Sequence, residues 1–152
     1  MTESNFVFME DLTVGQIFTA GPVTVTEAEI IEFAKKYDPQ PFHLNADDAA
    51  KTMFGGLIAS GWHTASMTMR MIIDSSPNFP GGMIGRTVEN LNWLRAVKPG
   101  DVLSYEGEIT DLRPAESAPG RGIMRVKSRT LNQNGKPVLE MEAVIFIPRR
   151  DP

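Results

Sequence analysis

Apolar residues recur with a helical period in the first half of the chain. Residues 26–29, Thr-Glu-Ala-Glu, match a capping box, in which a hydroxyl and a carboxylate each satisfy an unpaired backbone N–H at a helix start. One apolar helical face follows, made of Ile30, Ile31, Phe33 and Ala34. We expect this helix to end near Tyr37, because Pro39 disfavours the α conformation at Asp38. Asp38 is therefore expected at a helix exit.

The longest apolar segment, residues 57–73, carries a single charge, Arg70, and is rich in small residues and methionine. The pattern predicts a buried helix. A Gly-Gly breaker at 55–56 precedes it, and prolines and glycines at 77–82 mark the loop that ends it. Residues 44–54, between the two expected helices, are predicted to form a short capped helical turn at most.

The second half of the chain alternates between apolar and polar residues with a period of two, which is typical of strands. The expected strands are residues 87–97, 102–109, 123–131 and 139–147, with 23–26 as a short extended piece. We expect the first two of these strands to pair, and Asn134-Gly135 to form the turn between the last two. The predicted fold class is α+β, a single domain over 1–152 whose antiparallel sheet curls around the buried helix.

Composition narrows the class of protein. The 152 residues are 41% hydrophobic and 22% charged, as in ordinary globular domains. The absence of cysteine excludes disulfides, thiolate catalysis and cysteine-ligated zinc. A net charge of −4 without a basic stripe argues against nucleic-acid binding. The first residues lack the features of a signal peptide, and no apolar run approaches the ~20 residues of a membrane span. We therefore expect a soluble, cytoplasmic protein without a membrane contact.

Asp38 and His43 lie five residues apart on a segment stiffened by Pro39 and Pro41. A carboxylate and an imidazole on one such loop can converge on a single water, because the carboxylate orients the ring and the ring exchanges protons near neutral pH. An isolated pair with this spacing is also compatible with a turn-capping carboxylate beside an ordinary loop histidine. Both interpretations stay open at this point.

Ser60 and Gly61 stand near the start of the expected buried helix, where backbone N–H groups lack partners. Such an end can receive a developing oxyanion, and a residue without Cβ lets a carbonyl approach closely. Gly61 can equally serve tight packing of the helix on the sheet. His63, the other histidine, is expected to be a core or interface residue bonded to a backbone carbonyl. No metal is expected, since the spacing of the candidate ligands Asp38, His43, Asp47 and His63 matches no recognised motif.

Together these residues resemble the MaoC-like dehydratase family, which includes (R)-specific enoyl-CoA hydratases. The family motif runs approximately Asp-x-Asn-Pro-x-His, and the chain has Asp-Pro-Gln-Pro-Phe-His at 38–43. Residues 57–61, Leu-Ile-Ala-Ser-Gly, match the opening of the family's central helix, and 97–103, Val-Lys-Pro-Gly-Asp-Val-Leu, are also typical. Gln40 replaces the usual Asn, and Ser60 stands where a histidine is often found.

The resemblance implies a hotdog fold and a homodimer or dimer of dimers, with active sites at the dimer interface. It implies a hydro-lyase of fatty acid metabolism that takes an acyl-CoA, either an enoyl or a 3-hydroxyacyl thioester, without a cofactor. Asp38 and His43 would hold and activate the water, and the Gly61 N–H would polarise the thioester carbonyl. The expected substrate contacts are Gln40, Phe42, Ser60 and Trp62.

Two other functions remain open. Many hotdog thioesterases use a carboxylate on the central helix, and residues 57–73 contain neither Asp nor Glu. The second alternative is a noncatalytic protein that binds acyl thioesters, which an intact pair at Asp38 and His43 disfavours.

Overall fold

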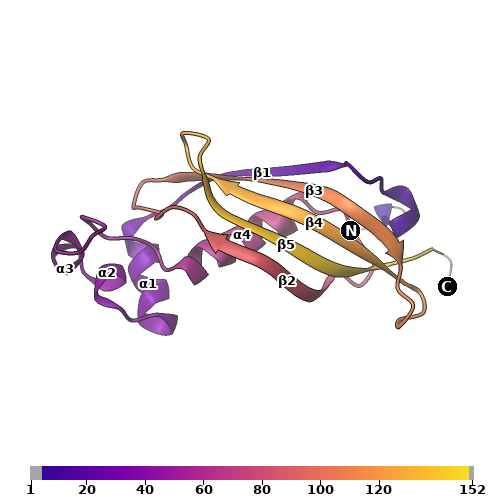
Figure 1. The fold of residues 1–152 in the computed structure, drawn as a ribbon, viewed down its shortest axis with the longest axis horizontal. Coiled ribbons are helices and arrows are strands. Elements are labelled where there is room, and N and C mark those ends of the chain that lie inside the picture. Colours follow the sequence, from indigo (N-terminus) through magenta and orange to yellow (C-terminus); the bar gives the residue numbers. More distant parts are fainter. Residues whose placement is uncertain (1–4, 151–152) are drawn as a thin grey trace.

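A computed structural model describes residues 5–150 (Figure 1). A 3-10 turn, η2 (Met9–Asp11), comes before the regular elements. The helices are α1 (Glu27–Tyr37), α2 (Pro41–Leu44), α3 (Ala46–Ala50) and α4 (Gly61–Ser75). The strands are β1 (Ile17–Thr24), β2 (Ile84–Trp93), β3 (Val102–Pro114), β4 (Arg121–Leu131) and β5 (Pro137–Pro148). Among the described residues, no helix is long and apolar enough to cross a membrane.

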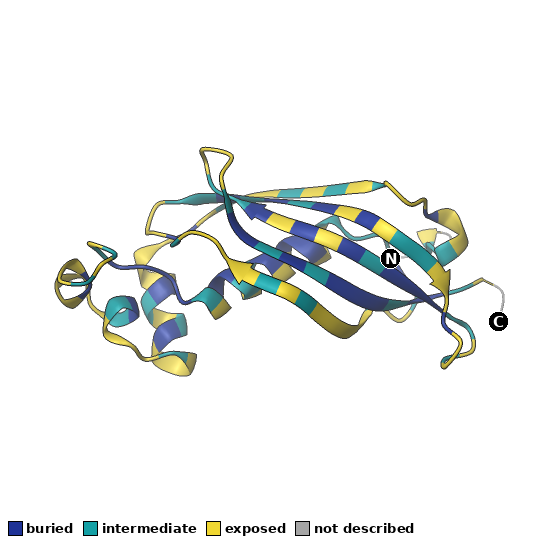
Figure 2. Cartoon of the chain, viewed as in Figure 1, coloured by how far each residue is buried: buried dark blue, intermediate teal, exposed yellow. Residues whose placement is uncertain are grey.

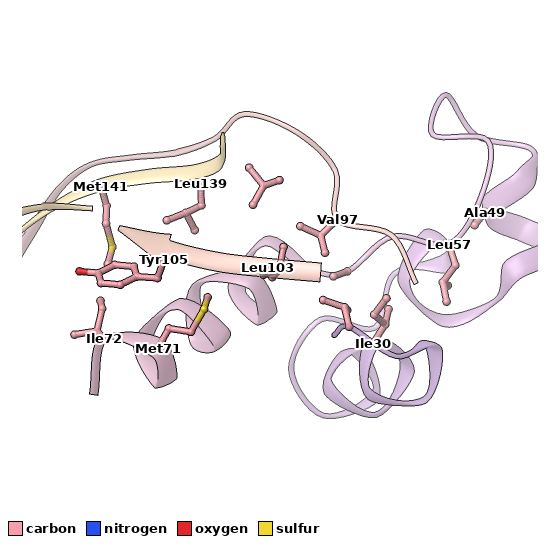
Figure 3. Packing of buried hydrophobic residues seen from close by; sticks show 13 residues of the cluster. Ile30, Ala49, Leu57, Met71, Ile72, Val97, Leu103, Tyr105, Leu139 and Met141 are labelled. Atoms are coloured by element: carbon pink, nitrogen blue, oxygen red, sulfur yellow. The ribbon is translucent and has the colours of Figure 1, made fainter. Parts of the chain in front are cut away.

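The strands form one antiparallel sheet in the order β1-β3-β4-β5-β2, and α4 lies along one face of it (Figure 1). The main core lies between this helix and the sheet (Figure 3). Met71 and Ile72 of α4 belong to the same buried cluster as Leu103 and Tyr105 of β3 and Leu139 of β5. The α+β class with a sheet wrapped around a central helix is thus confirmed.

The strand pairing differs from the expectation in two respects. The strand over residues 84–93 does not pair with β3 but with β5, while β3 lies between β1 and β4. Of the extended piece expected at 23–26, only residues 23 and 24 are in a strand, at the end of the eight-residue β1, which adds one strand to the four that were expected. An alternating pattern shows that a segment is a strand, but it carries no information about which strand lies beside it.

The central helix also differs from the prediction. Residues 57–60 form no regular element, and the helix begins only at Gly61, with Ser60 as its N-cap. One side of the helix is buried by residues such as Thr64, Thr68 and Met71. The other side is not, since its exposed apolar residues are Trp62, Met69 and Ile73.

The shorter helix α1 forms where its sequence predicts, but with half of the expected capping box: within residues 5–150 the Glu29 carboxylate bonds the Thr26 hydroxyl and no backbone N–H. The Thr26 hydroxyl oxygen accepts the backbone N–H of Glu29 at 3.2 Å and donates to the Glu29 carboxylate at 2.9 Å. Ile30 and Ala34 are fully buried on its inner face. The helix ends at Tyr37, and Asp38 is its C-cap with φ −151°. The prediction that Asp38 stands at a helix exit is therefore confirmed.

Candidate active site

A cavity of about 460 Å³ opens at the N-terminal end of α4. Its wall is built from the segment that follows α1, the first turn of α4 and the chain that leaves β2. Asp38, His43 and Gly61 line it, together with Trp62 and Trp93. Two backbone hydrogen bonds fix the segment before α4 to both sides: the Ile58 N–H donates to the Phe42 carbonyl at 3.1 Å, and the Ala59 N–H donates to the Val97 carbonyl at 2.8 Å.

The Asp38 carboxylate accepts two side-chain hydrogen bonds. Oδ1 accepts the Gln40 side-chain amide at 2.6 Å, and Oδ2 accepts the Ser60 hydroxyl at 2.7 Å. His43 Nε2 lies 3.3 Å from Oδ2. The Ser60 hydroxyl, and after it the Gln40 amide, lower the pKa of Asp38 below its usual value, because both bonds favour the charged form. Asp38 is therefore an ionised acceptor at the cavity wall.

His43 lies in α2, a single helical turn that begins with Pro41. Its side chain is buried, and its ring meets the Phe42 ring edge-on at 4.5 Å between centroids. Nδ1 lies 2.7 Å from the carbonyl oxygen of Ile58. Because a carbonyl only accepts, Nδ1 carries a proton in this contact. Nε2, which faces Asp38, is thus the ring atom left to take up or release a proton.

Gly61 is packed under an indole ring. A Cβ on Gly61 would lie 2.6 Å from the Nε1 and Cε2 atoms of Trp93, and the Trp93 Nε1–H donates to the Gly61 carbonyl at 2.7 Å. Tight packing, one of the two interpretations of this glycine, is therefore present. The Gly61 N–H is the first of the helix, and Ser60 caps the next one, that of Trp62. Within residues 5–150 the Gly61 N–H has no hydrogen-bond acceptor.

The expected substrate contacts divide into two groups. Phe42 and Trp62 line the cavity. Gln40 and Ser60 do not line it, and each hydrogen-bonds Asp38 instead. The sequence reasoning missed the Ile58 carbonyl and Trp93. Nothing in the sequence indicates that the Ile58 carbonyl belongs to the site. Trp93, a large aromatic residue in a predicted strand, is a weak indication.

His63 lies outside this cavity. Its ring is buried and stacks on the Phe33 ring of α1 with 4.9 Å between centroids, so its placement in the core is confirmed. The expected bond to a backbone carbonyl is wrong, because Nδ1 is buried and has no partner among the described residues. Burial lowers the pKa of His63, and the charge of Glu29 opposes that shift in part. Over residues 5–150 no three His, Asp or Glu side chains gather as metal ligands.

With this geometry in view, comparison with known proteins identifies the class. Residues 11–132 match the MaoC like domain, and the chain belongs to this MaoC-like dehydratase family. The crystal structure of the MaoC-like dehydratase from Rhodospirillum rubrum superposes with a TM-score of 0.88 at 42% identity, covering 96% of this chain and 99% of that one. The hotdog fold is thereby confirmed.

Two curated relatives extend over most of the chain. The uncharacterized protein YdeM of Bacillus subtilis is 29% identical over 93% of this chain and 99% of its own length. The (R)-specific enoyl-CoA hydratase of Rhodospirillum rubrum is 28% identical over 94% of this chain and 93% of its own length.

Proposed function

We propose that this protein is an (R)-specific enoyl-CoA hydratase, which adds water to a trans-2-enoyl thioester or removes it from a 3-hydroxyacyl thioester. The observation that carries the proposal is the pair formed by Asp38 and His43 on the cavity wall, 3.3 Å apart, at the same cavity as the Gly61 N–H. The relative named as an (R)-specific enoyl-CoA hydratase supports it.

The proposed reaction uses the two side chains on one water. The water donates a hydrogen bond to the ionised Asp38 and approaches Nε2 of His43. Its oxygen bonds to the β-carbon as one of its protons passes to the pair, and the electrons of the double bond move toward the thioester oxygen. The α-carbon then takes a proton from the same pair, so that one water has been added and the site is regenerated. Dehydration follows the same steps in reverse.

Gly61 would stabilise the negative charge that develops on the thioester oxygen. Its N–H stands at the positive end of α4, a helix of 15 residues, and Gly61 lines the cavity that the substrate carbonyl would enter. Loss of one such donor costs roughly 3 kcal/mol in comparable sites. The backbone donor is thus expected to matter about as much as a catalytic side chain.

The cavity also accounts for recognition of the substrate. The rings of Phe42 and Trp62 offer apolar contact to the acyl group, and Arg95 lines the same cavity. One Arg95 guanidinium nitrogen donates to the Pro137 carbonyl at 3.0 Å, which fixes the cation at the cavity. Its charge suits the phosphates of a CoA carrier. We infer that the acyl thioester is a CoA ester.

A dimer is part of the proposal. β2 ends the sheet on one side and is largely exposed (Figure 2). β2 and the residue after it expose four apolar side chains, and one of them, Trp93, also lines the cavity. The four are Ile84, Val88, Trp93 and Leu94. A free strand edge with apolar side chains favours pairing with another chain. We propose that a second copy covers this edge and completes the site, as a homodimer or a dimer of such dimers.

The test uses trans-2-butenoyl-CoA and the purified protein. We expect loss of the enoyl absorbance without release of free CoA thiol, and a product of (R) configuration. Asp38→Asn and His43→Ala are each expected to abolish turnover while the far-UV circular dichroism stays unchanged. Asp47→Asn, a carboxylate exposed on α3, is the matched control and should keep wild-type activity.

Each alternative gives a different result. Release of thiol while the enoyl group persists would indicate a thioesterase. The only carboxylate of α4, Asp74, lies near the far end of that helix and pairs with Arg70 at 3.1 Å, which disfavours that outcome. Binding of the thioester without turnover would indicate a noncatalytic binding protein. Wild-type rates in Asp38→Asn or His43→Ala would refute the assigned pair.

A further inference from the structure

The Asp38 carboxylate is held by two hydrogen bonds of similar length in different surroundings. The Gln40 amide reaches Oδ1 from an exposed position, where water can replace it. The Ser60 hydroxyl reaches Oδ2 at 2.7 Å from a fully buried position, away from bulk solvent. Hydrogen bonds from a neutral donor to an ionised acceptor are short and strong, and this one is of that kind. Ser60 is therefore the partner of Asp38 that is shielded from bulk solvent.

The direction of the Ser60 hydroxyl is fixed by a second contact. As the N-cap of α4, the Ser60 oxygen accepts the Trp62 N–H at 3.3 Å. Because that lone pair is engaged, the single hydroxyl proton is left to point at Asp38. The Ser60 carbonyl accepts the Thr64 N–H at 3.1 Å, which holds the residue in the helix start. One residue thus joins the C-terminal end of α1, where Asp38 stands, to the N-terminal end of α4.

The oxygen that Ser60 binds is also the oxygen that faces His43. Oδ2 lies 2.7 Å from the Ser60 hydroxyl and 3.3 Å from His43 Nε2. A rotation of the carboxylate would break the first contact and turn Oδ2 away from the ring. Ser60 itself does not line the cavity. Its hydroxyl can therefore act on the reaction only through its two partners, the Asp38 carboxylate and the capped first turn of α4.

We propose that Ser60 is a positioning residue, whose buried hydroxyl holds the Asp38 carboxylate in the orientation that presents Oδ2 to His43 and to the attacking water. This inference rests on the proposed function, and it deepens it by assigning a role to a side chain outside the cavity. In this chain a serine that does not line the cavity holds the carboxylate, at the position where a histidine often stands in similar sequences.

The test compares Ser60→Ala with Ser60→Thr, using trans-2-butenoyl-CoA. Ser60→Ala removes the hydroxyl, and we expect kcat to fall roughly tenfold to a hundredfold, as for loss of a hydrogen bond to a charged group. KM should stay within about twofold, because Ser60 does not touch the cavity. The acid limb of the kcat/KM profile should move to higher pH, since the carboxylate loses its main stabilising donor. Ser60→Thr keeps a hydroxyl and should restore both kcat and the acid limb.

Loss of a helix cap needs its own control, because Ser60 also caps α4. Thr26→Ala removes a hydroxyl cap of the same kind from α1, far along the helix from Asp38. We expect this variant to lose some stability in urea while its pH profile stays that of the wild type. A Ser60→Ala variant whose rate falls without any displacement of the acid limb, and without rescue by threonine, would overturn the proposal.

A measurement without substrate separates this inference from the proposed function. The carboxyl ¹³C resonance of Asp38, assigned by its absence from Asp38→Asn, is titrated in wild type and in Ser60→Ala. Titration at higher pH in Ser60→Ala supports the hold of Ser60 on Asp38, and an unchanged titration overturns it. A wild type that hydrates no enoyl-CoA would instead overturn the proposed function, whatever the titration shows.

Discussion

At the scale of single residues, the two members of the pair are held by different kinds of partner. Asp38 is held by side-chain donors, the Ser60 hydroxyl and the Gln40 amide, which keep it ionised. His43 is held by a backbone acceptor, the Ile58 carbonyl, which fixes the proton on Nδ1. One residue is thereby prepared to accept a hydrogen bond and the other to exchange a proton through Nε2. The two roles follow from the chemistry of the partners and not from the distance between the pair.

Gly61 offers a prediction at this scale, because its packing against Trp93 can be separated from the role of its backbone N–H. Gly61→Ala retains the N–H but places a Cβ against the Trp93 indole. We expect it to lower the free energy of unfolding by about 1–3 kcal/mol, the usual cost of overpacking. In a Trp93→Ala background the same substitution should cost little, since the obstructing ring is gone. Urea unfolding of the four proteins measures this coupling, and equal costs in both backgrounds would contradict it.

Arg95 offers a second prediction. If its charge meets the phosphates of the carrier, Arg95→Ala should raise KM for an enoyl-CoA about fivefold, the worth of roughly 1 kcal/mol at an exposed ion pair. An enoyl ester of pantetheine lacks the nucleotide phosphates, so its KM should not change. Lys127→Ala, at an exposed position of β4, is the matched loss of charge and should leave both values unaltered. Steady-state kinetics with the two thioesters at low salt make the comparison, and equal effects on both would exclude Arg95 from phosphate binding.

At the scale of elements, the two edges of the sheet lead to different expectations. β1 closes one side of the sheet and β2 the other, and each exposes a branched apolar side chain, Ile17 and Val88 respectively. Only β2 leads into the cavity, through Trp93. If a second copy pairs along β2, Val88→Lys buries a charge in the interface and should weaken the dimer at least tenfold. Light scattering over a dilution series measures the effect.

Ile17→Lys places the same charge on the opposite edge and should leave the dimer intact. A wild-type protein that stays monomeric at all concentrations while it hydrates substrate would contradict the shared site. Dissociation by Ile17→Lys and not by Val88→Lys would place the interface on β1 instead.

The same scale shows how far the sequence predicts this fold. The sequence predicts α1 to within a residue at both ends, because Thr26 caps its start and Pro39 closes it, and both are local signals. The strands were recognisable from their alternation, yet the partner of β2 was not, because the pairing with β5 joins segments about fifty residues apart. The sequence predicts the start of α4 too early, because the apolar residues 57–59 resemble part of a helix until their backbone bonds to Phe42 and Val97 are known.

The contacts of the site are also predictable from the sequence only where they are local. The pair of Asp38 and His43 is local, five residues apart, and could be proposed from the sequence. The contacts that decide its behaviour are not local: Ser60 is 22 residues from Asp38, and Trp93 is 32 residues from Gly61. No spacing rule predicts contacts of this length. They arise only when the helices and the sheet are packed together.

At the scale of the whole molecule, His63 links the two long helices and makes stability depend on pH. Its ring stacks on Phe33 of α1, and the charged residues around the same small cavity are Glu29, Glu32 and Lys36. Burial lowers the pKa of His63 below 6.5, so the unfolded chain binds a proton that the folded one rejects. The contribution of His63 to stability is therefore expected to be fully present above pH 6.5 and to be lost as pH falls below it, by up to about 1.4 kcal/mol per pH unit.

His63→Phe tests this dependence, because it keeps an aromatic ring on Phe33 and removes the titrating group. We expect the variant to lose less stability than wild type between pH 7.5 and pH 5.5, by roughly 1 kcal/mol. Urea unfolding at the two pH values gives the four free energies that are needed. Glu29 remains in both proteins. In the wild type its charge favours the protonated imidazole, which makes the difference in lost stability between the two proteins smaller. Equal losses in the two proteins would show that α1 and α4 are joined without a titrating contact, and that the acid sensitivity of the fold lies in its carboxylates.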